Sequence, residues 1–121
     1  MRVAVVGASR DRRKFGNKAV RAFASAGHTV YPVNPDAESV EGLRAYASVL
    51  DVPGPIDMAT VYVQPEVAIG LLDDFAQKAI PEIWFNPGSD SDELMSETRR
   101  HKLNAVYACS IAGIGQDPGK Y

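Results

Sequence analysis

Short apolar runs and helix-like repeats alternate along the whole chain. The run Val3–Val6 is β-branched and stops at Gly7, a pattern typical of a buried strand that ends in a tight turn. Over residues 17–25 apolar positions recur at the spacing of one helix face, and Gly27 follows where such a helix would end. The same pattern predicts further strands at 28–33, 57–63, 82–85 and 105–109, with further helices at 65–79 and after residue 90.

This alternation predicts an α/β fold: a single Rossmann-type domain whose mostly parallel sheet carries helices on both faces. The 121 residues suffice for one such domain with a full core, so we assign it residues 1–121. We expect residues 110–121 to form an irregular tail.

Local features sharpen this prediction. Pro32 lacks a backbone donor, so we place it at the C-terminal end of the second strand, where pairing gives out. Gly42–Tyr46 is a candidate third strand, and Ser48 is a candidate cap for a single helical turn. Asp90 and Glu93 have the spacing of a capping box at the start of the last long helix.

Composition narrows the classes of partner. The net charge of −2 does not favour a general nucleic-acid or membrane-surface binder, and no run of about 18 apolar residues is present to span a bilayer. The single Cys109 cannot form an internal disulfide. We therefore expect a cytoplasmic protein that binds neither nucleic acid nor membrane.

The candidate ligand site lies where the strands end, because ligands of such sheets bind outside the carboxyl ends of the strands. Gly7 follows the first strand and precedes a helix, which suits a phosphate. The next residues are basic and favour an anion with more than one phosphate; they are Arg10, Arg12, Arg13 and Lys14. The match to the dinucleotide pattern G-x-G-x-x-G is only partial, so a plain turn with solvated arginines is the alternative.

The end of the second strand discriminates between nucleotides. An NAD site normally places an acidic residue there for the ribose, whereas this chain has Val33, Asn34 and Pro35. NAD is therefore disfavoured. Coenzyme A, with its diphosphate and 3′-phosphate, fits the basic loop, and NADP fits it nearly as well by charge.

Four motifs in order resemble the small standalone CoA-binding domain proteins. These are VAVVGAS at 3–9, VYPVNP at 30–35, DMATVYVQP at 57–65 and WFNPG at 84–88. That family is similar to the N-terminal CoA-binding domain of the succinyl-CoA synthetase α-subunit and of ADP-forming acyl-CoA synthetases. The resemblance covers about residues 2–110 and implies a site for CoA or an acyl-CoA.

The resemblance also implies roles for individual residues. Gly7, Ala8 and Ser9 would contact phosphate, and Val33, Asn34 and Pro35 would frame the adenosine. Tyr62, Val63 and Pro65 would line the path of adenine and pantetheine, with Phe85, Asn86 and Gly88 further along the groove. Members often have a lysine where this chain has Asp36, so the basic loop would supply the missing positive charge.

The sequence predicts binding without a catalytic constellation. No nucleophile with a base and no metal-spaced cluster is apparent, and His28, His101 and Cys109 are interpreted as structural. Two alternatives stay open: an NADP-binding redox sensor or oxidoreductase fragment, and a Rossmann-fold interaction protein without a ligand. A protein partner or a homo-oligomer also stays open.

Overall fold

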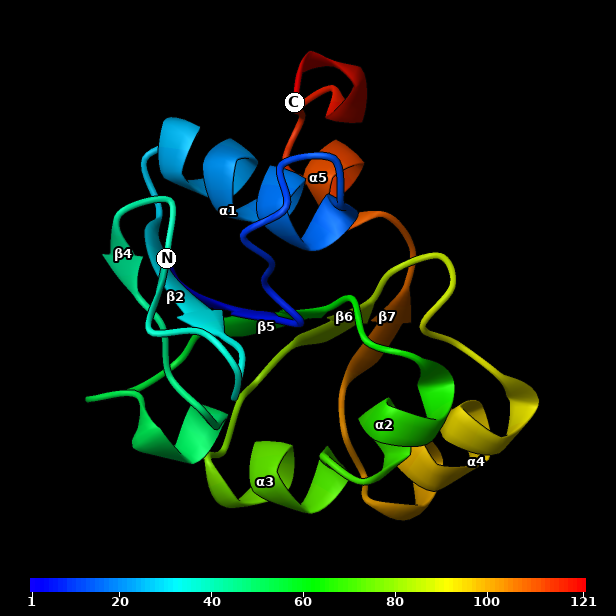
Figure 1. Cartoon of the computed structure of the whole chain (residues 1–121). Coiled ribbons are helices and arrows are strands. Elements are labelled where there is room, and N and C mark those ends of the chain that lie inside the picture. Colours follow the sequence, from blue (N-terminus) through cyan, green and yellow to red (C-terminus); the bar gives the residue numbers. More distant parts are fainter.

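Five strands form one parallel sheet at the centre of the protein (Figure 1). The computed structural model describes all 121 residues. The strand order is β2-β1-β5-β6-β7, with bounds β1 Arg2–Val6, β2 Thr29–Val33, β5 Met58–Val61, β6 Ile83–Phe85 and β7 Ala105–Tyr107. Because β1 pairs with both β2 and β5, the loops that follow these three strands emerge side by side.

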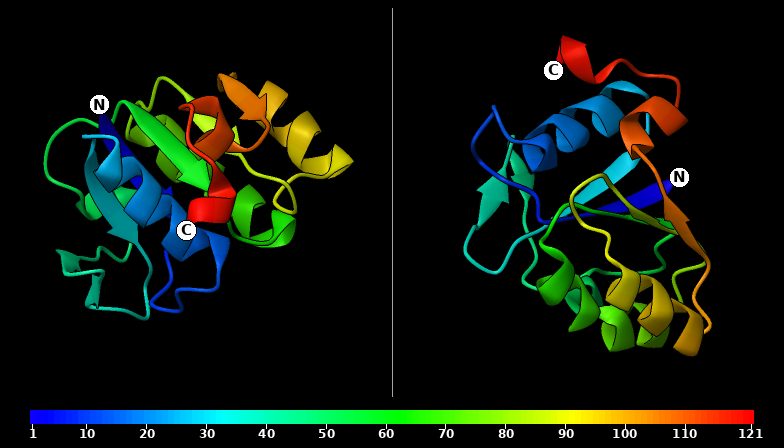
Figure 2. Two further views of the ribbon diagram at one scale, coloured as in Figure 1. Left: turned by 90° about the horizontal axis from the view of Figure 1, so that it is seen from above. Right: turned by 90° about the vertical axis from the view of Figure 1, so that its right-hand side faces the viewer.

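Helices cover both faces of the sheet (Figure 2). On one face lie α1 (Phe15–Ser25) and α5 (Ser110–Gly113), and on the other lie α2 (Pro65–Ile69), α3 (Leu72–Gln77) and α4 (Asp92–Arg100). A hairpin of β3 (Ser39–Val40) and β4 (Leu43–Arg44) and two single helical turns, η1 (Val49–Asp51) and η2 (Pro118–Lys120), complete the chain. None of these helices has the length and apolar character that a membrane crossing requires.

The core forms a layer on each side of the sheet because successive side chains of β1 point in opposite directions. Val3 and Val5 belong to the cluster that includes Phe23 of α1, whereas Ala4 and Val6 belong to the cluster that includes Phe75 of α3. Burial on both faces explains why this strand is an unbroken apolar run. The predicted fold class, a Rossmann-type α/β domain, is confirmed.

Pro32 is the penultimate residue of β2, close to where it was expected, but the reason for its tolerance is different. β2 is the edge strand, so its outer side needs no continuous row of donors. Pro32 pairs in register with Val5, and on the outer side its carbonyl accepts a hydrogen bond from the Tyr46 amide at 2.9 Å.

The candidate strand at Gly42–Tyr46 is shorter than expected. Leu43 and Arg44 form β4, which pairs with β3 in an antiparallel hairpin, and Tyr46 makes a single parallel bridge to Val33 of β2. Glu41 and Gly42 have φ angles of 50° and 76°, as a tight two-residue hairpin turn requires. The predicted cap is confirmed, because Ser48 Oγ accepts from the Leu50 amide at 3.1 Å.

The single helix predicted at 65–79 is two helices. Gly70, a weak helix former, follows α2, and α3 begins two residues later. Pro65 occupies the first helical position of α2, as expected. In α2, Ala68 is fully buried in the core, whereas Val67 is 52% exposed.

The cap of α4 lies one residue beyond the predicted one. Ser91 Oγ accepts from the Leu94 amide at 3.1 Å, so Ser91 and not Asp90 is the N-cap. Aspartate and serine are both good N-cap residues, so the spacing from Asp90 to Glu93 could not decide between Asp90 and Ser91.

The prediction of an irregular tail at 110–121 is also wrong. This segment contains α5 and η2, and it lies along α1 (Figure 2). Ile111 is fully buried in the core cluster of α1. Ile114 and Tyr121 also pack against this cluster, but so few apolar side chains were too weak a pattern to predict it from the sequence.

The start of α1 packs very closely against the turn after β1. A Cβ atom added to Gly16 would lie 2.1 Å from the Gly7 carbonyl oxygen, a separation that no substitution can accommodate without moving the helix. Glycine at position 16 therefore fixes the distance between helix and turn.

We expect Gly16→Ala to lower the free energy of unfolding by about 3 kcal/mol or more, in the upper range for overpacking. Gly27→Ala is the matched control: Gly27 has a φ of 88° with no atom near its added Cβ, so only the backbone penalty of about 1 to 2 kcal/mol applies. Denaturant unfolding of both variants measures the difference. Equal losses would contradict the steric argument.

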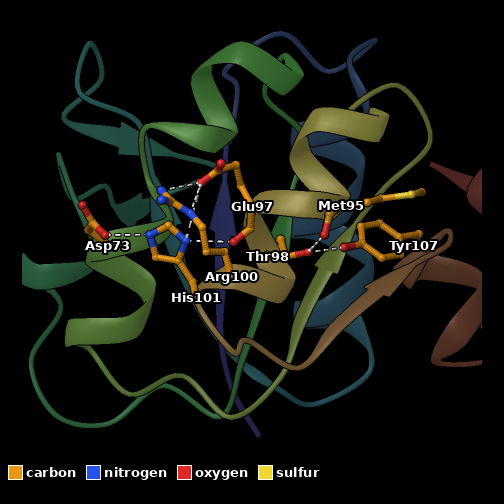
Figure 3. A network of polar contacts seen from close by, with 7 residues as sticks. All are labelled: Asp73, Met95, Glu97, Thr98, Arg100, His101 and Tyr107. Carbon is orange, nitrogen blue, oxygen red and sulfur yellow. Dashed lines mark hydrogen bonds and ion pairs between the residues drawn. The ribbon is translucent and has the colours of Figure 1, made fainter.

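A polar network joins α3 to α4 (Figure 3). His101 Nε2 donates to Asp73 Oδ1 and His101 Nδ1 to the Glu97 carbonyl, each at 2.8 Å. Both acceptors need a protonated nitrogen, so the contact is complete only in the imidazolium form. The hydrogen bond to the Glu97 carbonyl, followed by that to Asp73, raises the pKa of His101 above its ordinary value of 6.5.

The sign of this pKa change predicts a pH dependence. The stabilisation is fully present below pH 6.5 and is lost as the pH rises through the higher pKa of the folded protein. We expect the difference in unfolding free energy between the wild type and His101→Gln to shrink over that interval in denaturant titrations. Asp73→Asn should retain a weaker dependence, and a difference that grows with pH would contradict the assignment.

Candidate functional site

A cavity of about 700 Å³ opens at the carboxyl edge of the sheet, beside the ends of β1, β2 and β5. Its walls come from the turn after β1, the start of α1, the segment after β2, η1, α2, α3 and the turn after β6. The lining residues are Val6, Gly7, Ala8, Ser9, Lys14, Phe15, Gly16, Val33, Asn34, Pro35, Asp36, Ala47, Ser48, Val49, Tyr62, Val63, Gln64, Val67, Leu71, Asp74, Phe75, Pro87, Gly88 and Ser89.

The turn at Gly7 can be made only by a residue without a side chain. Its φ is 88°, and an added Cβ would lie 2.9 Å from Val63 Cγ1. The amides of Gly7 and Ala8 both donate to the Val33 carbonyl, at 3.0 and 3.3 Å. These two hydrogen bonds connect the turn to the end of β2. A side chain at position 7 would collide with Val63, in the segment after β5.

The N-terminus of α1 offers unused donors to the cavity. The amides of Phe15 and Gly16 donate to no group of the protein, and both residues line the cavity. The N-cap, Lys14, makes no capping bond through its side chain, and the first turn contains no acidic residue. The positive end of an 11-residue helix is therefore available to an anion.

Lys14 is the one basic residue of the loop that lines the cavity. Arg13 is paired with Asp11, whose pKa it lowers to about 2 through side-chain and backbone hydrogen bonds. Arg12 forms an ion pair with Glu41 of the β3–β4 hairpin at 3.4 Å. Arg10 does not line the cavity either.

Asn34 connects the two segments that border the Gly7 turn. Its Nδ2 donates to the Ala8 carbonyl at 2.8 Å, and its Oδ1 accepts from the Asp36 amide at 2.8 Å. Asp36 and Asp74 both line the cavity, so two acidic residues border it together with Lys14. The sequence analysis noted Asp36 as an acid where relatives often have a lysine, and the structure places this residue at the cavity wall.

Besides the three arginines, three more of the expected site residues lie outside this cavity. Asn86 is buried, and its side chain is used within the protein: Nδ2 donates to Thr60 Oγ1 at 2.7 Å, and Oδ1 accepts from the Ser110 amide at 2.8 Å. Pro65 does not line the cavity. Phe85 is buried and lines a second cavity of about 210 Å³.

Tyr62 joins this internal network to the main cavity. Its hydroxyl lies 3.2 Å from Ser110 Oγ, and burial raises the pKa of the phenol. Val63 and Gly88 also line the cavity.

The sequence interpretation missed the apolar walls that η1, α2 and α3 contribute. Phe15 and Val67 line the cavity although their side chains are 53% and 52% exposed. The sequence pattern does not show that these two side chains border the cavity, because that depends on how α1 and α2 pack around it.

Comparison with known proteins identifies relatives along the whole chain. The model of the CoA binding domain family matches residues 1–115. The uncharacterized protein YneT of Bacillus subtilis is 30% identical over 92 residues, which are 76% of this chain and 68% of that protein.

Longer relatives are ligases. The ADP-forming acetate–CoA ligase II of Archaeoglobus fulgidus is 39% identical over 80 residues, which cover 64% of this chain. The match spans only 12% of the length of that ligase.

Solved structures share the fold. A conserved hypothetical protein from Pyrococcus furiosus superposes with a TM-score of 0.85 at 29% identity, covering 93% of this chain and 97% of that one. A dinucleotide-forming acetyl-coenzyme A synthetase from Ca. Korarchaeum cryptofilum, solved with phosphate and ADP, has a TM-score of 0.76 at 29% identity. The superposition covers 88% of this chain and 25% of the synthetase chain.

Proposed function

Because the chain belongs to the CoA-binding domain family, we propose that its 700 Å³ cavity binds coenzyme A or an acyl-CoA. The volume lies within the usual range of about 300 to 1,000 Å³ for small-molecule sites. The observation that supports the proposal most directly is the pair of unused amides at Phe15 and Gly16, which border the cavity beside Lys14.

The diphosphate of the ligand would lie at this helix N-terminus. Backbone amides and the helix dipole stabilise phosphate oxygens there. Ser9 adds a hydroxyl at the cavity wall, although it already accepts from the Asp11 amide at 3.0 Å. Gly7 lets the backbone approach the ligand without a side chain between them.

The adenosine would lie along 33–36, between the end of β2 and the apolar walls. Val49 and Phe75 supply apolar surface for a base on that side. Asp36 suits a ribose hydroxyl, because a carboxylate accepts hydrogen bonds, and it is unfavourable for a 3′-phosphate.

The pantetheine arm would leave along Tyr62 and Val63 toward the turn after β6. Pro87 and Gly88 line both the main cavity and the second cavity of about 210 Å³. Because the two cavities share this wall, the arm would run from the main cavity toward the second one and end there. Phe85 and Tyr107 border the second cavity.

A thermal-shift panel tests the function. The ligands are CoA, acetyl-CoA, succinyl-CoA, dephospho-CoA, NAD, NADP and ATP, each at the same excess. At 100-fold excess over its dissociation constant a true ligand adds about 2.7 kcal/mol to the stability of the folded state, which is several degrees in a domain of this size.

We expect a rise with the CoA species. Because Asp36 faces the cavity, dephospho-CoA should stabilise the protein at least as well as CoA does. A rise with NADP alone would favour the redox alternative, and no rise with any ligand would favour an interaction protein without a nucleotide.

Charge at the helix start provides a second prediction. Lys14→Ala should weaken CoA binding by about tenfold or more, since a hydrogen bond to a charged group contributes roughly 1.5 to 3 kcal/mol. Arg13→Ala is the matched control, because Arg13 is exposed and paired with Asp11 away from the cavity. Isothermal titration calorimetry measures both, and an equal or larger effect at Arg13 would contradict the proposed position of the diphosphate.

A further inference from the structure

The loop between Gly7 and Phe15, called here the phosphate loop (residues 8–14), is contacted by an arginine of α1 that lies outside the cavity. The guanidinium of this residue, Arg21, donates to three acceptors: Asn17 Oδ1 at 2.7 Å, the Arg12 carbonyl at 3.0 Å and the Tyr121 carbonyl at 3.0 Å. One side chain thus contacts α1, the phosphate loop and the C-terminal segment.

The bond to Asn17 fixes the orientation of a buried amide. Asn17 is fully buried, and with its oxygen directed to Arg21 its Nδ2 donates to the Ser9 carbonyl at 2.9 Å. The same nitrogen donates to Glu41 Oε2 at 3.1 Å, and Glu41 also pairs with Arg12. If Arg21 were lost, the amide oxygen would have no donor, and burial makes an unpaired acceptor costly.

Two carbonyls of the phosphate loop therefore have donors behind the loop. The Ser9 carbonyl is held by Asn17 and the Arg12 carbonyl by Arg21. A carbonyl oxygen turned into the cavity would repel a phosphate, so holding these two oxygens on α1 favours an anion-binding conformation.

The C-terminal segment is the third member of the contact. The Arg21 guanidinium lies 5.8 Å from the centre of the Tyr121 ring, in addition to its bond to the Tyr121 carbonyl. The Tyr121 hydroxyl donates to Gln116 Oε1 at 3.1 Å. The backbone amide of Gln116 donates to the carbonyl of the buried Ile111. The segment is thus anchored in the core at one end and contacts Arg21 at the other.

We propose that Arg21 is a positioning residue for the phosphate loop and that the segment 110–121 stabilises the anion-binding conformation of the loop through it. This inference rests on the proposed function for its ligand but makes a separate prediction for the free protein.

Hydrogen–deuterium exchange of the ligand-free protein tests the loop directly. Arg21→Ala should speed exchange of the amides in residues 8–14 by about tenfold or more, and Tyr121→Ala should produce a smaller increase in the same residues. The matched control is Arg100→Ala, which removes an exposed arginine that pairs with Glu97 on α4 and should change nothing in the loop.

The specificity of the change decides the role. Exchange that rises equally in the loop and in β1 and β5 would show general destabilisation and overturn the inference, as would unchanged exchange in the loop. An effect of Arg21→Ala without any effect of Tyr121→Ala would overturn the part assigned to the C-terminal segment.

Calorimetry with CoA supplies the functional measurement. Arg21→Ala should weaken CoA binding by about tenfold or more, and Arg21→Lys should recover part of the loss, because lysine keeps the charge but cannot hold three acceptors in one plane. Wild-type affinity in Arg21→Ala would overturn the inference. If the wild type itself does not bind CoA, the proposed function fails, while the exchange experiment still decides whether Arg21 holds the loop.

Discussion

The site depends on the close contact between Gly16 and the Gly7 carbonyl. With no room for a Cβ between them, the first turn of α1 lies directly against the end of β1, and the free amides of Phe15 and Gly16 reach the cavity. Dinucleotide sites obtain the same approach with glycines a few residues apart. In this chain Gly7 and Gly16 flank a longer loop, and a longer loop loses more conformational freedom when it is held in one conformation. The network of Asn17, Arg21 and Glu41 supplies that restriction from side chains.

The charge around the cavity favours backbone donors over basic side chains. Arg12 pairs with Glu41 and Arg13 with Asp11. Lys14 is therefore the one basic residue of the loop at the cavity, where the acidic residues Asp36 and Asp74 also lie. Recognition of an anion at this site would therefore depend mainly on amides that the fold holds in place. Their positions follow from packing, and salt screens them less than it screens exposed side chains.

The sequence predicted what depends on local pattern and missed what depends on tertiary packing. The continuous apolar run of β1 and the glycine after it are visible in the letters, and from them follow the strand, the turn and the edge of the sheet where the cavity lies. The sequence does not show which way the arginine side chains point. Arg12, for example, pairs with Glu41, which lies in a hairpin 29 residues further along the chain. The ordered segment 110–121 was not predicted for a similar reason: Ile111 and Ile114 give only one short apolar pair, and their packing against the core cluster of α1 is visible only in the structure.

The asparagines after β2 and β6 use their side chains mainly to connect segments of the protein around the cavity. Asn34 and Asn86 stand in the two asparagine–proline pairs by which the chain resembles its family, and a contact with the ligand was the natural interpretation. In the structure Asn34 holds the Ala8 carbonyl and the Asp36 amide, and Asn86 holds β5 and the start of α5. An asparagine side chain presents a donor and an acceptor like a peptide group, so it can join two backbone segments that no strand pairing connects. The motifs therefore specify the frame of the cavity, and this frame holds in place the backbone amides, the apolar walls and the charged residues Lys14, Asp36 and Asp74 that border it.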